Sequence, residues 1–119
     1  MEIKFKDMVV TLVKPGADIM NSLTAEKVNI WHLATGVSGE AGELLDAIKK
    51  HVIYNKPLDR ENIIEELGDL MFYMEGLMQA LSISGEECIS ANIEKLGVRY
   101  SQGYSDKAAQ ERADKVEEK

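Results

Sequence analysis

Two short pairs of acidic residues are the groups in this sequence best suited to chemistry. Glu40 and Glu43 form an E-x-x-E motif, and Glu66 and Asp69 form an E-x-x-D motif after an interval of 22 residues. A spacing of three places both side chains of a pair on one face of a helix. Four carboxylates that converged would repel one another unless a cation lay between them. The sequence therefore predicts a site for Mg²⁺, with Mn²⁺ as an alternative, because both cations prefer oxygen ligands.

The two pairs keep the same position relative to the apolar stripes of their helices. Since each residue turns a helix by about 100°, Glu40 lies about 80° from the centre of its stripe, and Glu43 lies a further 60° round. Glu66 and Asp69 take the same two offsets, so helices packed through these stripes would carry both pairs along one edge of the contact. Tyr73 follows on the same line, where it could touch a ligand. The alternative for either pair alone is a solvated helix face.

A row of hydrogen-bond donors and positive charge lies further along the chain. Asn92, Lys95 and Arg99 have i, i+3, i+7 spacing and stand beside Tyr100. In an acidic protein such a row would complement phosphate oxygens. The alternative is ordinary surface ion pairing with Glu94 or with the polar residues near the C-terminus.

The elements that must position these groups are helices. Apolar residues recur at helical spacing in four segments, and no segment alternates as a strand would. Thr24 and Asp59 are suitable N-caps, and Ser84 opens a capping box with Glu87. The predicted helices cover about residues 5–13, 25–54, 60–81 and 85–100, with residues 17–23 as a connection.

Three glycines interrupt the second predicted helix at Gly36, Gly39 and Gly42. Each costs about 1 kcal/mol relative to alanine in a helix interior. Their spacing suggests a bare strip where another backbone or a ligand comes close. A loop over residues 35–39 that splits the helix is the alternative.

Size, composition and charge restrict the remaining choices. The chain has 119 residues, of which 45% are hydrophobic. This size and composition predict one domain over residues 1–104, followed by a polar, charged tail over residues 105–119. Residues 101–119 predict either a frayed helix or disorder. The net charge of −7 argues against nucleic-acid binding. A single cysteine, Cys88, excludes an internal disulfide and fits the cytoplasm, and no segment resembles a signal peptide or membrane span.

Residues 33–46, 65–70 and 92–100, with Gly103 and Tyr104 beyond, resemble the MazG-like nucleotide pyrophosphohydrolases. These belong to the all-α nucleoside triphosphate pyrophosphatase superfamily, which also contains the dimeric all-α dUTPases and dCTPases. The resemblance implies an all-α, four- to five-helix bundle-like domain that assembles into a homodimer or a dimer-based tetramer. It also implies hydrolysis of (d)NTPs to (d)NMPs and pyrophosphate.

By position in the same resemblance, four residues would be Mg²⁺ ligands: Glu40, Glu43, Glu66 and Asp69. Five more would bind substrate: Tyr73 against the nucleotide, and Asn92, Lys95, Arg99 and Tyr100 at the phosphates or sugar. Metal-activated water would attack the α-phosphorus, and one of the glutamates among the four ligands would take its proton. Trp31 and His32 are candidates for contact with the base, with packing as the alternative.

Other functions remain open at this point. Within the same superfamily, the chain could be a specialised dUTPase or dCTPase. A different class is a non-catalytic acidic helical module that binds partner proteins through the methionine-rich face of the third helix. A ferritin-like di-iron bundle needs Glu-x-x-His motifs, and neither His32 nor His51 follows a glutamate at that spacing.

Overall fold

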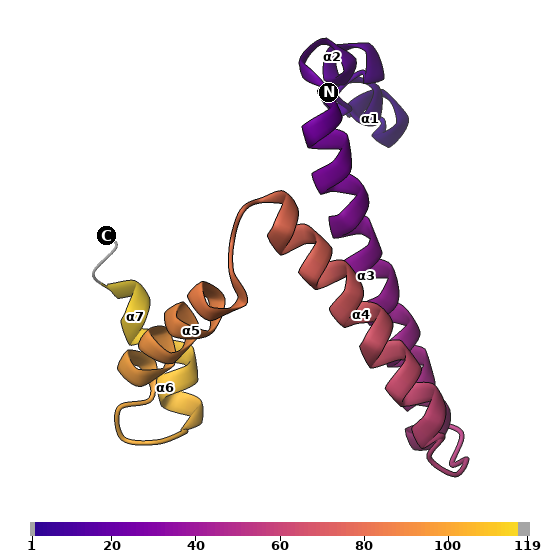
Figure 1. The fold of residues 1–119 in the computed structure, drawn as a ribbon. Coiled ribbons are helices and arrows are strands. Elements are labelled where there is room, and N and C mark those ends of the chain that lie inside the picture. The colour runs from indigo at the N-terminus through magenta and orange to yellow at the C-terminus, as the bar shows by residue number, and fades with distance from the viewer. Residues whose placement is uncertain (1, 117–119) are drawn as a thin grey trace.

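Helices are the only regular secondary structure in residues 2–116, the part of the chain that this computed structural model describes (Figure 1). The all-α fold class is therefore confirmed. The helical segments are α1 (Phe5–Leu12), α2 (Gly16–Ser22), α3 (Ala25–Val52), α4 (Arg60–Ala80), α5 (Gly85–Arg99), α6 (Asp106–Glu111) and α7 (Ala113–Val116).

The three predicted N-caps begin the three longest helices. The side chain of Thr24 accepts the N–H of Lys27 at 3.2 Å, and that of Asp59 accepts the N–H of Asn62 at 3.1 Å. Ser84 and Glu87 form the complete capping box, with hydrogen bonds of 3.1 and 2.7 Å. Each cap satisfies a backbone donor that the first turn of a helix leaves unpaired.

Helix α3 runs unbroken through its three glycines, so the alternative of a loop over residues 35–39 is wrong. The glycine cost is offset by packing, because α3 and α4 lie side by side along most of their length. The bare-strip interpretation holds at Gly36, where a Cβ would overlap the ring of Tyr73. Nothing else in the described chain approaches Gly39 or Gly42 within 4 Å of that position.

Most of residues 17–23 lie in α2, so the prediction of a connection over these residues is wrong. Pro15 is the N-cap of this helix. Its carbonyl accepts the N–H groups of Asp18 at 3.0 Å and Ile19 at 3.2 Å. Asp18 also lies in the first turn, where its negative charge interacts favourably with the positive end of the helix dipole. The helix has only seven residues, too few for a clear apolar period.

Helices α3 and α4 form an antiparallel hairpin around a tight connection. At the end of α3, the ring Nδ1 of His51 lies 2.7 Å from the carbonyl oxygen of Lys56, and Asn55 takes a left-handed φ of 54°. Half-buried apolar side chains of α3 then face α4, among them Leu33, Val37 and Leu44. Ala47, at 7% exposure, is buried at the same contact and is the one residue classed as buried in the described part of the chain.

The hairpin leaves much apolar surface uncovered. Trp31 on α3 is 76% exposed and Phe72 on α4 is 69% exposed. The radius of gyration is 20.2 Å, whereas a compact domain of 100 residues has about 13 Å. A single copy of the chain therefore has little core of its own. None of the described helices has the length and hydropathy needed to span a membrane.

Helices α5, α6 and α7 form a separate group beside the hairpin, reached through residues 81–84 (Figure 1). Both α6 and α7 pack against α5. The described part of the C-terminal tail is thus mostly helical and folds back on the preceding helix. Residues 117–119 of that tail lie outside the described residues.

Candidate metal centre

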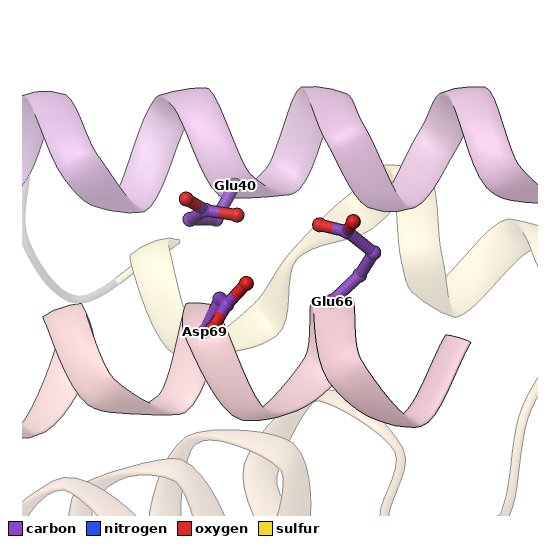
Figure 2. A group of neighbouring side chains, drawn as sticks. All are labelled: Glu40, Glu66 and Asp69. Carbon is purple, nitrogen blue, oxygen red and sulfur yellow. The ribbon is translucent and has the colours of Figure 1, made fainter. Parts of the chain in front are cut away.

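Three of the four predicted carboxylates meet between α3 and α4. Glu40 on α3 and Glu66 and Asp69 on α4 each offer a carboxylate oxygen, and these oxygens all lie within 4.8 Å of one another. Figure 2 shows Glu40 pointing from one helix toward the space into which the other two side chains reach. We call these residues the acidic triplet. Glu40 and Glu66 are half-buried and Asp69 is exposed, so the triplet lies where the helix contact meets solvent.

The hairpin geometry explains why these residues meet. In an antiparallel pair, a residue some way before the connection on one helix lies opposite a residue at a similar distance after it. Gly36 of α3 lies against Tyr73 of α4, and Leu33 lies against Gly76, so a step forward along α3 matches an equal step back along α4. Glu40, four residues after Gly36, therefore lies opposite Asp69, four residues before Tyr73, and Glu66 follows one turn away.

The electrostatics of the triplet are those of an uncompensated negative cluster. The pKa of Glu66 is raised, first by its partial loss of solvent and then by the neighbouring charges of Glu40, Glu43 and Asp69, and a hydrogen bond with Glu40 adds to the shift. A raised carboxyl pKa means that the protein environment disfavours the charged form. A cation at this point would reverse that penalty.

The donor set fits a hard divalent cation. Carboxylate oxygens are the protein ligands that Mg²⁺ and Mn²⁺ prefer. Two oxygens on opposite sides of one Mg²⁺ are about 4 Å apart, because each bond is about 2.1 Å long. The observed span of up to 4.8 Å is therefore near the required spacing, and the site keeps an exposed side for water or substrate.

Glu43 lies outside the triplet. It is exposed on α3 one turn beyond Glu40, yet its charge contributes to the raised pKa of Glu66. Its position at the rim of the cluster leaves it within electrostatic reach of the other carboxylates.

Tyr73 lies one turn beyond Asp69, and its ring packs against α3. The ring occupies the space that a side chain at Gly36 would need. His32 meets the same ring edge-on with centroids 6.4 Å apart, and Phe72 does so at 5.3 Å. Tyr73 is half-buried, so in this structure it joins the two helices close to Glu40.

Trp31 does not share the face of the triplet. It precedes Glu40 by nine residues, which turns it about 180° away on the same helix. Its ring instead lines a groove with Ile19, Leu23 and Val28, between α2 and α3. Trp31 is 76% exposed and is therefore not a core residue of a single chain, and its direction on α3 points away from the triplet of that chain. Its packing between chains and its contact with a base stay predictions.

The predicted substrate-binding residues of α5 are not near the triplet of their own chain. Asn92, Lys95 and Arg99 belong to the α5–α7 group, which stands apart from the hairpin in Figure 1. The Nε of Arg99 donates to Asp114 of α7 at 2.9 Å, so the alternative of ion pairing with the C-terminal region holds for this residue. Tyr100 packs on Tyr104 with ring centroids 5.6 Å apart.

Asp114 is the residue of interest that sequence reasoning missed. It stands in a charge-rich segment with no motif around it, so only its charge opposite to that of Arg99 was available as a signal.

Comparison with known proteins agrees with this geometry. The model of the MazG nucleotide pyrophosphohydrolase domain matches residues 30–103, which include most of α3, all of α4 and α5, and every predicted site residue. This chain belongs to the MazG family. The family assignment made from the motifs is thus confirmed, and with it a nucleotide pyrophosphohydrolase role at the level of the family.

A relative of this MazG-family chain is the gene 37 protein of Mycobacterium phage L5. The two are 29% identical over 98 residues, which cover 78% of this chain and 82% of the phage protein. No solved structure matches the chain. The shared region thus extends beyond the MazG match, which begins at residue 30.

Proposed function

We propose that this chain is a Mg²⁺-dependent nucleoside triphosphate pyrophosphohydrolase that converts (d)NTP and water to (d)NMP and pyrophosphate. The observation that carries the proposal is the acidic triplet, because it gathers three carboxylates where solvent and substrate can enter. Mn²⁺ is an alternative metal. Membership of the MazG family supports the reaction class.

The proposed ligands are Glu40, Glu66 and Asp69, with Glu43 joining them at the rim. When bound, the cation supplies charge neutralisation for the triphosphate and acidifies a water molecule. The chain's own residues orient the phosphates, and one of the three glutamates accepts the proton of the attacking water. Pyrophosphate then leaves as the α-phosphorus bonds to the water oxygen.

Self-association is the second part of the proposal. The chain would form a homodimer or a dimer-based tetramer, since a single copy exposes Trp31, Phe72 and neighbouring apolar residues on the outer faces of its hairpin. Contiguous apolar surface of this kind marks interaction sites. Docking between chains would bury these faces and bring the cationic residues of α5 to an acidic triplet. In this proposal the methionine-rich face of α4 binds a second copy of the chain, whereas in the alternative of a non-catalytic module it would bind another protein.

The test is pyrophosphate release from a panel of canonical and modified NTPs and dNTPs, including dUTP and dCTP, with and without Mg²⁺. Glu66→Gln should lower kcat/KM by at least about 100-fold, because it removes one charge from the triplet at constant shape. Glu65→Gln is the matched control, since Glu65 is an exposed neighbour on the same helix outside the triplet. Circular dichroism should show the same helix content in both variants.

Two outcomes would contradict the proposal. One is the absence of pyrophosphate release from every nucleotide with Mg²⁺ or Mn²⁺. The other is equal activity of the Glu66→Gln and Glu65→Gln variants, which would place the reaction elsewhere.

A further inference from the structure

The ion pair between Arg99 and Asp114 differs from the other ion pairs of the described residues. Its atoms are 2.9 Å apart, its side chains are only 16% and 8% exposed, and it joins two helices. Lys50 with Asp46 and Lys107 with Glu111 are instead exposed i, i+4 pairs within one helix. Arg99 is thus held by a specific, long-range and partly buried contact.

The C-terminal segment, residues 105–116, has local features that bring Asp114 back to α5. Gly103 takes a positive φ of 85°, and Ser105 caps α6 by accepting the N–H of Ala108 at 3.0 Å. Arg112 then takes a left-handed φ of 51° between α6 and α7, which turns the chain toward α5.

The C-terminal segment lies against the face of α5 that carries Lys95 and Arg99. A groove of about 320 Å³ lies between α5 and α7, and Lys95 lines it together with Asp114. Both cations of the row at positions 92, 95 and 99 therefore lie beside the C-terminal segment. An anion reaching Arg99 must compete with a carboxylate already bound there.

We propose that the C-terminal segment is autoinhibitory, with the Asp114 carboxylate taking the place of a substrate phosphate oxygen on Arg99. This inference rests on the proposed function, in which α5 binds the triphosphate. Carboxylate and phosphate oxygens are interchangeable partners for a guanidinium, since both accept charge-assisted hydrogen bonds from its N–H groups. Bidentate binding of a phosphate through the Nε edge of the guanidinium needs the Nε–H that now donates to Asp114, so this mode of substrate binding requires release of Asp114.

A closed state of this kind lowers apparent affinity by the fraction of molecules that are open. Removing the carboxylate should therefore tighten phosphate binding at Arg99. The experiment compares full-length wild type with Asp114→Asn and Asp114→Ala. Glu111→Gln is the matched control, because it removes a charge from the same segment but breaks only the exposed pair with Lys107.

The first readout is calorimetric binding of inorganic tripolyphosphate with Mg²⁺, and the second is KM for the best nucleotide. Both Asp114 variants should bind tripolyphosphate about 3- to 10-fold more tightly and show a lower KM, whereas Glu111→Gln should match wild type. The gain should disappear when Arg99→Ala is added to Asp114→Asn.

Unchanged or weaker tripolyphosphate binding in both Asp114 variants would overturn the inference and leave Asp114 as a structural partner that orients Arg99. Thermal melts identify a variant that fails to fold, and the second substitution then provides the comparison. Because the binding readout needs no turnover, a failure of the proposed hydrolysis is seen separately, as absent pyrophosphate release by wild type.

Discussion

In both the α3–α4 hairpin and the α5–α7 group the chain folds back on itself, but the hairpin gathers charges of the same sign, whereas the α5–α7 group pairs charges of opposite sign. The hairpin partly removes Glu66 from solvent and brings like charges beside it, and both effects, the loss of solvent first, raise the pKa of Glu66. The α5–α7 group brings opposite charges together, and a hydrogen bond from Arg99 lowers the pKa of Asp114. A cluster with uncompensated charge favours a ligand of opposite sign, whereas a neutralised pair must first open. The α3–α4 hairpin therefore holds the proposed cation site, whereas the α5–α7 group holds the proposed anion-binding residue in an ion pair.

The proposed assembly would bring the two regions together between chains, and the largest expected effect comes from preventing that assembly. Phe72→Glu places a charge on the exposed apolar face of α4 and should convert the proposed homodimer or tetramer to single chains of 13.3 kDa. Activity should fall by about 100-fold or more, since a charge buried at an interface is costly and the α5 cations then lack an acidic triplet. Sedimentation velocity and pyrophosphate release measure both effects.

Gln102→Glu, which adds the same charge at an exposed polar residue, is the control and should keep wild-type mass and activity. A fully active single chain of the Phe72→Glu variant would show that assembly is not needed to complete the site.

A smaller effect should follow from changing the contact that holds the hairpin together near the triplet. Gly36→Ala requires the Tyr73 ring to move, at a cost of about 1–3 kcal/mol for overpacking, against a gain of about 1 kcal/mol in helix propensity. Gly42→Ala meets no such obstacle within the chain and should show the propensity gain alone. Urea unfolding compares the two variants, and equal stability would mean that Tyr73 does not need the space at Gly36.

The smallest expected effect is a pair of opposite pH dependences. The folded pKa of Asp114 is lowered, so its contribution to stability is present above the ordinary aspartate pKa and is lost as pH falls toward the folded value. The folded pKa of Glu66 is raised, so its charged form destabilises the metal-free protein at neutral pH, and protonation removes that cost.

Thermal melts without metal, from pH 7 to 3, should therefore show Asp114→Asn less stable than wild type at neutral pH and Glu66→Gln more stable. Both differences should shrink in acid. Two differences of the same sign at neutral pH would contradict the contrast between the regions.

Local sequence signals anticipated much of the fold and the centre of the site. The caps at Thr24, Asp59 and Ser84 begin the expected helices, because capping depends on residues within one turn. Glu40, Glu66 and Asp69 meet as their spacing indicated, since one short connection fixes the register of two helices. Helix α2 was missed because its seven residues carry too little periodicity.

The sequence alone determined the four longest helices, α1, α3, α4 and α5, the acidic motifs and, through these motifs, the MazG family. Only the tertiary structure decided that Glu43 lies at the rim, that Tyr73 packs on Gly36, and that Arg99 binds Asp114. The physical reason is the sequence separation of the interacting residues. Helix periods and caps depend on residues three or four positions apart. The contacts of Tyr73 and Arg99 join residues 15 or more positions apart, so they depend on how whole helices pack.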